Sequence, residues 1–72
     1  MRFRYRTRRG LAEIVPHRGR WIIVFDGEAL EPHTSPQSAA EAIANGYCSF
    51  AGDVDTSTLG IPEDLSMWER SA

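Results

Sequence analysis

The residues best suited to bind a charged ligand stand near the N-terminus, where arginine alternates with other side chains. Positions 2–8 read Arg-Phe-Arg-Tyr-Arg-Thr-Arg, a period-two pattern typical of a half-buried strand. On such a strand the guanidinium groups share one face and the aromatic rings the other. Guanidinium groups in a row can contact phosphates or the carboxylates of an acidic protein. The candidate partner contacts are therefore Arg2, Arg4, Arg6 and Arg8.

Two kinds of partner fit this arginine row. Binders of single-stranded nucleic acid combine a basic groove with stacking aromatic rings, but here the rings would lie on the opposite face. Residues 1–20 carry seven Arg and one Glu, net +6, whereas residues 21–72 carry one Arg and nine acids, net −8. The acidic part would repel nucleic acid. The split favours a protein partner, either acidic or a second copy bound head to tail, and single-stranded nucleic acid stays as the alternative.

Other polar residues give no convincing catalytic or metal site. Asp53, Asp55 and Ser57 have the spacing of a calcium loop, but Thr58 stands where that loop needs glycine. His17, His33 and Cys48 are too widely spaced for a zinc site, and we expect both histidines in exposed turns. We therefore expect no catalytic residue, no metal and no cofactor, and a protein that is not an enzyme.

Size and composition indicate one small domain. The chain has 72 residues, and a domain of this size has a thin core with little room for a deep active site. Its single cysteine, Cys48, cannot form an internal disulfide. We therefore expect the protein to be located in the reducing cytoplasm. No apolar run approaches the length that spans a bilayer. Whether the arginines reflect function or a genome rich in G and C stays open.

A β-hairpin over residues 20–31 is the clearest structural signal. Residues 21–25 read Trp-Ile-Ile-Val-Phe without a polar residue, which indicates a central strand covered at least in part on both faces. Asp26-Gly27 supplies the positive φ angles of a type I′ turn. Pro32 is expected to end the returning strand. Earlier, residues 11–15 are prone to form a strand, which Pro16 should end or place at an edge.

One helix should follow the hairpin. Ser35-Pro36 is a typical helix start, and residues 36–45 are rich in alanine with Gly46 behind them. Residues 47–50 can add a strand. The tail, residues 51–72, is expected to be partly irregular and to end in a short helical turn that folds Trp68 back over the sheet or helix. Leu65 and Trp68 are the candidate interaction residues of this tail.

Three segments together resemble a family of small uncharacterised bacterial proteins, a domain of unknown function. They are Gly-Arg-Trp-Ile-Ile-Val-Phe-Asp-Gly-Glu at 19–28, Ser-Pro-Gln-Ser-Ala-Ala at 35–40, and Thr-Leu-Gly-Ile-Pro-Glu-Asp-Leu with Trp68 at 58–68. The resemblance implies a bacterial source and supports the fold, and it implies no activity. We predict an α+β domain over residues 1–72, with a mainly antiparallel sheet of three to five strands and one helix on one face. Its favoured function is a non-enzymatic protein-interaction or accessory module.

Overall fold

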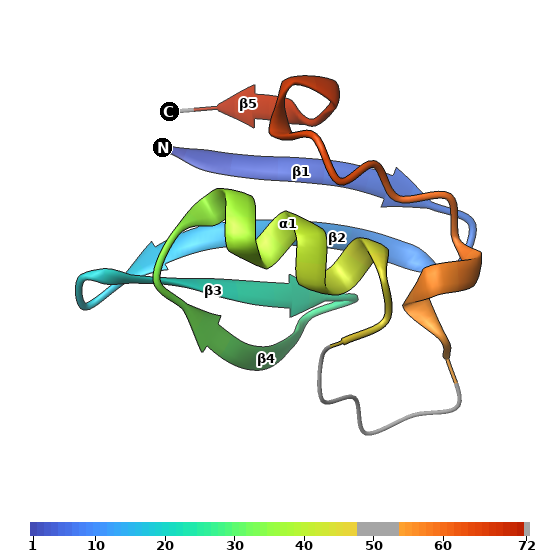
Figure 1. Ribbon diagram of the computed structural model, residues 1–72, viewed down its shortest axis with the longest axis horizontal. Helices are drawn as coiled ribbons and strands as arrows, with labels where there is room; N and C mark the ends of the chain where they lie inside the picture. Colours follow the sequence, from blue (N-terminus) through green and yellow to red (C-terminus); the bar gives the residue numbers. More distant parts are fainter. Residues whose placement is uncertain (48–53, 72) are drawn as a thin grey trace.

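A computed structural model describes residues 1–47 and 54–71 as one five-stranded antiparallel sheet with one α-helix (Figure 1). The strands follow the order β4-β3-β2-β1-β5 across the sheet. This confirms the predicted α+β class. The expected C-terminal helical turn consists of short 3-10 turns. The elements are β1 (Arg2–Thr7), β2 (Gly10–His17), β3 (Arg20–Phe25), β4 (Glu28–His33), α1 (Pro36–Ala44), η1 (Thr56–Thr58), η2 (Leu65–Met67) and β5 (Glu69–Ser71).

The predicted hairpin is confirmed as β3 and β4. Asp26 and Gly27 join them with φ angles of 51° and 85°, the left-handed values that a type I′ turn requires. Pro32 does not end the second strand, which continues to His33. An edge strand tolerates proline because its outer N–H positions need no partner, and β4 is an edge strand.

The first two strands differ in part from the prediction. β1 ends at Thr7, so Arg8 lies in the following turn and not in the arginine row. Pro16 neither ends β2 nor places it at an edge, because β2 lies between β1 and β3 and runs on to His17. The pairing of β2 with β1 stops at Ile14, whereas Pro16 lies opposite Trp21 of β3. The missing N–H of Pro16 therefore removes no bond to β1.

Helix α1 begins and ends close to the predicted positions. The hydroxyl oxygen of Ser35 accepts a hydrogen bond from the Ser38 backbone N–H at 3.1 Å, which is the usual N-cap contact. Asn45 is the C-cap. The helix buries small side chains, Ala39, Ala40 and Ala42, together with Ile43. Small side chains let its axis lie close to the sheet.

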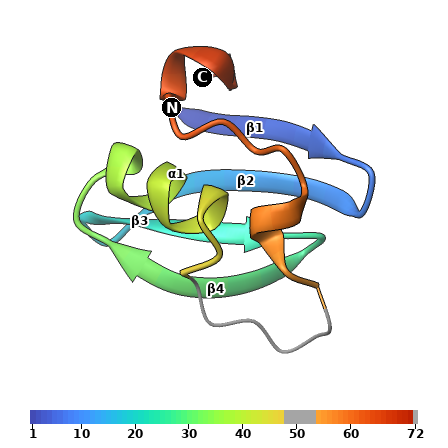
Figure 2. The ribbon, with the colours of Figure 1, turned by 45° about the vertical axis from the view of Figure 1, so that its right-hand side comes forward.

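The tail folds back as predicted and adds a strand that the sequence did not predict. From residue 54 it runs past α1 and reaches β1, where β5 pairs with Arg2, Phe3 and Arg4 (Figures 1 and 2). Trp68 is 5% exposed and its ring lies 5.8 Å from that of Tyr5. The expected strand at 47–50 falls outside the described residues except for Tyr47, which is 79% exposed and in no regular element.

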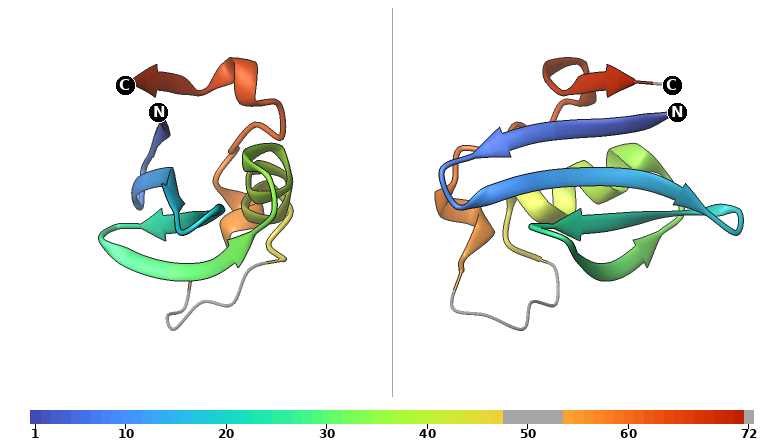
Figure 3. Two further views of the ribbon diagram at one scale, coloured as in Figure 1. Left: turned by 90° about the vertical axis from the view of Figure 1, so that its left-hand side faces the viewer. Right: turned by 180° about the vertical axis from the view of Figure 1, so that it is seen from behind.

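Helix α1 and the segment 54–68 lie on the same face of the sheet (Figure 3, left). The core fills the space between them and that face. It is built by side chains from three central strands, the helix and the tail: Phe3, Ala12, Ile14, Ile23, Phe25, Ala39, Ala40, Ala42, Ile43, Leu59, Ile61 and Trp68. Seen from behind, no described segment lies over the opposite face (Figure 3, right).

Candidate functional site: the outer sheet face

The outer face is the side of the sheet that points away from α1. Residues directly opposite each other on neighbouring strands point to the same face, so the strand register defines its members. Arg4 pairs with Glu13, Glu13 with Val24, and Val24 with Ala29. Alternation along each strand adds the remaining members. The outer face thus includes Arg2, Arg4, Arg6, Leu11, Glu13, Val15, Ile22, Val24, Ala29 and Pro32.

Four aliphatic side chains lie near the centre of this face, with Glu13 between two of them on β2 and opposite Val24. Leu11 and Val15 come from β2, and Ile22 and Val24 from β3; all four are half-buried. None belongs to the core or packs against it. We call these four residues the aliphatic patch. A sheet with one solvated face normally shows polar residues there, and the patch departs from that pattern at two adjacent central strands.

The sequence contains a signal for this patch, the unbroken apolar run at 21–25. This run predicted a strand covered at least in part on both faces. Among the described residues, the cover is present over Ile23 and Phe25 and absent over Ile22 and Val24. The run therefore marks a strand that is central in the sheet but has only one of its two faces covered by described parts of this chain.

The arginine row lies beside the patch, and its members have different surroundings. The Arg4 guanidinium donates to the Glu69 carboxylate at 2.7 Å. Arg8, outside the row in the turn after β1, donates to the Thr58 carbonyl oxygen at 3.2 Å. The side chains of Arg2 and Arg6 make no hydrogen bond or ion pair with any described residue. The row thus offers two uncommitted guanidinium groups, and the predicted contact role of all four residues stays a prediction.

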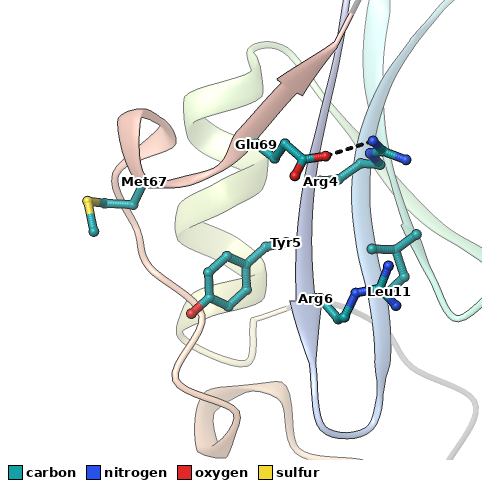
Figure 4. A pocket seen from close by; sticks show the side chains of 6 residues that line it. All are labelled: Arg4, Tyr5, Arg6, Leu11, Met67 and Glu69. Atoms are coloured by element: carbon teal, nitrogen blue, oxygen red, sulfur yellow. Dashed lines mark hydrogen bonds and ion pairs between the residues drawn. The ribbon is translucent and has the colours of Figure 1, made fainter.

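A polar groove of about 340 Å³ connects the arginine row to the tail. Its lining residues are Arg4, Tyr5, Arg6, Leu11, Met67 and Glu69. Figure 4 shows Arg4, Arg6 and Leu11 on one side of β1 and Tyr5 and Met67 on the other. The groove opens where β5 stops covering β1, because β5 pairs only as far as Arg4. Leu11 belongs both to this groove and to the aliphatic patch.

The two candidate interaction residues of the tail, Leu65 and Trp68, both make contacts within the fold. The Trp68 indole N–H donates to the Pro62 carbonyl oxygen at 2.9 Å, and the ring is buried against Tyr5. Leu65 is half-buried and packs against the core. More exposed than either is Met67, at 66%. An interaction role for Leu65 and Trp68 stays a prediction, and their contacts account for how the tail is held.

Both histidines lie at strand ends and not in the expected turns, and only one of them is exposed. His17 is exposed at the end of β2, but His33 is half-buried at the end of β4. Its Nδ1 lies 3.5 Å from the Ser38 hydroxyl, and its buried Nε2 has no hydrogen-bond partner among the described atoms. A nucleophilic serine needs a histidine that a third group orients. No described residue takes that place, so this pair has no catalytic geometry.

Two aspartates of the tail cap its 3-10 turns. Asp55 accepts from the Ser57 hydroxyl at 2.6 Å and from its backbone N–H at 3.0 Å. Asp64 accepts from the Ser66 backbone N–H at 2.9 Å. These hydrogen bonds stabilise the charged carboxylates and hold the pKa of each aspartate below its ordinary value. Within 1–47 and 54–71 no group of three metal-ligating side chains gathers; Asp53 and Cys48 lie outside these ranges.

Comparisons with family models, with curated proteins and with solved structures gave no match. Among the described residues, no helix has the length and apolar character needed to cross a membrane.

Proposed function

We propose that this protein is a non-enzymatic protein-interaction module that docks through the outer face. The observation that carries the proposal is the aliphatic patch of Leu11, Val15, Ile22 and Val24, which no described segment covers. Contiguous apolar surface rimmed by polar groups is characteristic of interaction sites. The proposed setting is a bacterial cytoplasm, which suits a chain with one cysteine.

The rim of the patch fits a protein surface of mixed character. An interface has an apolar centre and a polar margin, and arginine is enriched in it. Here Arg4 and Arg6 flank the patch on the β1 side, and the Arg6 guanidinium is uncommitted among the described residues. A partner that buries the patch would gain apolar contact at the centre. A carboxylate of that partner at the margin would meet Arg6.

The alternative is binding of single-stranded nucleic acid by the arginine row. In its favour, Arg2 and Arg6 are exposed. Against it, Phe3 is buried in the core and Tyr5 packs against Trp68 on the other face. The aliphatic patch offers no ring for a base to stack on, and stacking supplies much of the affinity in such binders.

A capture experiment from the native cell tests the proposed function. The tagged wild type is compared with Val24→Glu, which places a charge in the patch, and with Thr34→Glu, which adds the same charge in the exposed connection between β4 and α1. We expect a protein retained by the wild type and by Thr34→Glu and lost with Val24→Glu. Retention by all three proteins would contradict docking through the outer face. A catalytic turnover abolished by one substitution would contradict the non-enzymatic function.

A fluorescence titration with a labelled single-stranded oligonucleotide distinguishes nucleic-acid binding from the proposed protein interaction. We expect no binding at physiological salt. Binding that persists there and weakens when Arg4 and Arg6 become alanine would favour the nucleic-acid function instead.

A further inference from the structure

The edge of the sheet at β1 is covered along only part of its length. β5 pairs with β1 as far as Arg4 and no farther. Opposite Arg6 the tail turns away, because the Met67 backbone N–H donates to the Asp64 carbonyl oxygen at 3.0 Å within η2. Within the described part of the chain, the second half of β1 therefore has an open edge. The groove of about 340 Å³ lies beside it.

The hydrogen-bond pattern of the sheet directs the backbone of Arg6 toward this open edge. Along a strand of an antiparallel sheet, successive residues bond alternately to one neighbouring strand and to the other. The Leu11 carbonyl oxygen accepts from the Asp26 N–H at 2.9 Å on the β3 side. Ala12 therefore bonds toward β1, where it lies opposite Tyr5. Tyr5 in turn bonds toward β2, so the N–H and C=O of Arg6 point away from β2 and into the open edge.

The side chains around the open edge favour an acidic segment. The Arg6 guanidinium lines the groove and makes no hydrogen bond or ion pair with any described residue. Glu69 also lines the groove, but its carboxylate accepts from the Arg4 guanidinium at 2.7 Å. Tyr5 and Met67 line the other side (Figure 4), and Met67 is 66% exposed. The groove thus combines an uncommitted positive charge with apolar surface.

The opposite edge of the sheet, β4, is unsuited to strand addition. Val15 bonds toward β3 by the same alternation as Leu11, and it lies opposite Ile22. Ile22 therefore bonds toward β2, and the position of the missing N–H of its β4 neighbour, Pro32, faces outward. A proline at that position removes a donor that an added strand needs. The open part of β1 contains no proline.

We propose that the open edge of β1 binds an extended acidic segment of a partner protein, which adds to the sheet as a strand beside Arg6. The segment residue opposite Arg6 exchanges backbone hydrogen bonds with it in both directions. Its side chain lies on the same face as the Arg6 guanidinium, so a carboxylate fits there. The neighbouring segment residues point to the other face, toward Tyr5 and Met67, where apolar side chains fit. Strand addition is a recurring mode of peptide recognition. This inference goes beyond docking through the aliphatic patch, because it concerns the sheet edge.

Amide NMR of the labelled full chain, titrated to about 2 mM with a capped synthetic peptide of central sequence Val-Glu-Val, tests the proposal. We expect the Arg6 amide to shift and to exchange with solvent more slowly in the presence of the peptide. A peptide methylated on the glutamate nitrogen lacks the N–H that faces Arg6 and should not bind. Methylation of the following valine nitrogen, which faces away from β1, should change the dissociation constant by less than about twofold.

Variants of Arg6 separate its backbone from its charge. Arg6→Ala keeps the N–H and should raise the dissociation constant about threefold. Arg18→Ala, in the exposed turn between β2 and β3, is the matched control and should leave it unchanged. Arg6→Pro also removes the N–H and should abolish binding. Its fold, checked by thermal unfolding, should survive, because proline is tolerated where the N–H faces outward from an edge.

The outcomes that overturn the proposal are specific to the edge. They are an unshifted Arg6 amide at the highest peptide concentration, equal binding of the two methylated peptides, and an Arg6→Pro variant that unfolds or still binds. Val24→Glu should bind the peptide as the wild type does. Loss of peptide binding in a folded Val24→Glu variant would place the peptide on the aliphatic patch and would also overturn strand addition. Failure at the edge therefore leaves the proposed function to its own capture experiment.

Discussion

At the scale of single residues, turn chemistry could be predicted where its cause is local. Asp26-Gly27 was predicted from two neighbouring residues, and both have the positive φ angles that the turn requires. Gly10 differs, because its φ of 143° accompanies a close approach to a residue that is distant in sequence. A Cβ atom added there would stand 2.9 Å from the Asp26 Cβ. The sequence shows no sign that the turn after β1 and the turn after β3 touch.

Gly10→Ala tests this contact against a matched glycine. The substitution meets both an unfavourable φ and a steric clash, and should lower the free energy of unfolding by at least about 2 kcal/mol. Gly19→Ala is the control, because its φ is 79° but nothing lies within 4 Å of the added Cβ; it should cost about 1 kcal/mol. Urea unfolding measures both. Equal costs would contradict a close approach at Gly10.

Asp64 should contribute to stability in a way that depends on pH. Hydrogen bonds from Ser66 hold its folded-state pKa below the ordinary value of 3.8. The unfolded chain therefore binds a proton at higher pH than the folded chain does. The contribution is present above about 3.8 and is lost as pH falls through the lower folded value. Asp64→Asn should flatten the loss of stability in that acid window, which urea unfolding between about pH 2 and 5 would show. An unchanged pH dependence would contradict it.

At the scale of elements, periodicity and capping residues predicted the hairpin and the helix. Residues 20–31 and 36–45 correspond closely to β3, β4 and α1, because their signals lie within each segment. β5 could not be predicted from the tail. Its three residues, Glu69–Ser71, carry no strand pattern, and they extend because β1 offers them a free edge. The place of Pro16 inside β2 likewise depends on where β1 stops pairing, which the segment 10–17 does not encode.

Trp68 is the residue that holds the tail element in place. Replacing it with alanine removes a buried ring that packs against Tyr5 and should cost about 3–5 kcal/mol. Trp68→Phe keeps an aromatic ring and loses the hydrogen bond to the Pro62 carbonyl oxygen, so we expect a smaller loss of about 1–2 kcal/mol. Thermal and urea unfolding measure both. An alanine variant as stable as the wild type would show that the tail does not need this ring.

At the scale of the whole molecule, only part of the outer face could be predicted from the sequence. The arginine row at 2–8 was predicted by alternation, and its position beside an aliphatic patch was not. Leu11 and Val15 lie on the outer face because of the register in which β2 pairs with β1 and β3. That register depends on the strand order. The apolar run at 21–25 predicted a strand covered at least in part on both faces, and the described segments lie over only one of them.

Residue-resolved NMR of the labelled protein, with and without an extract of the native cell, tests the central claim most directly. The claim is that the outer face is the interaction surface. We predict that the extract shifts the amide signals of Leu11, Val15, Ile22 and Val24 and leaves those of α1 unchanged. Val24→Glu should abolish these shifts. Shifts confined to α1 and the segment 54–68, or a wild-type spectrum that the extract leaves identical, would contradict docking through the outer face.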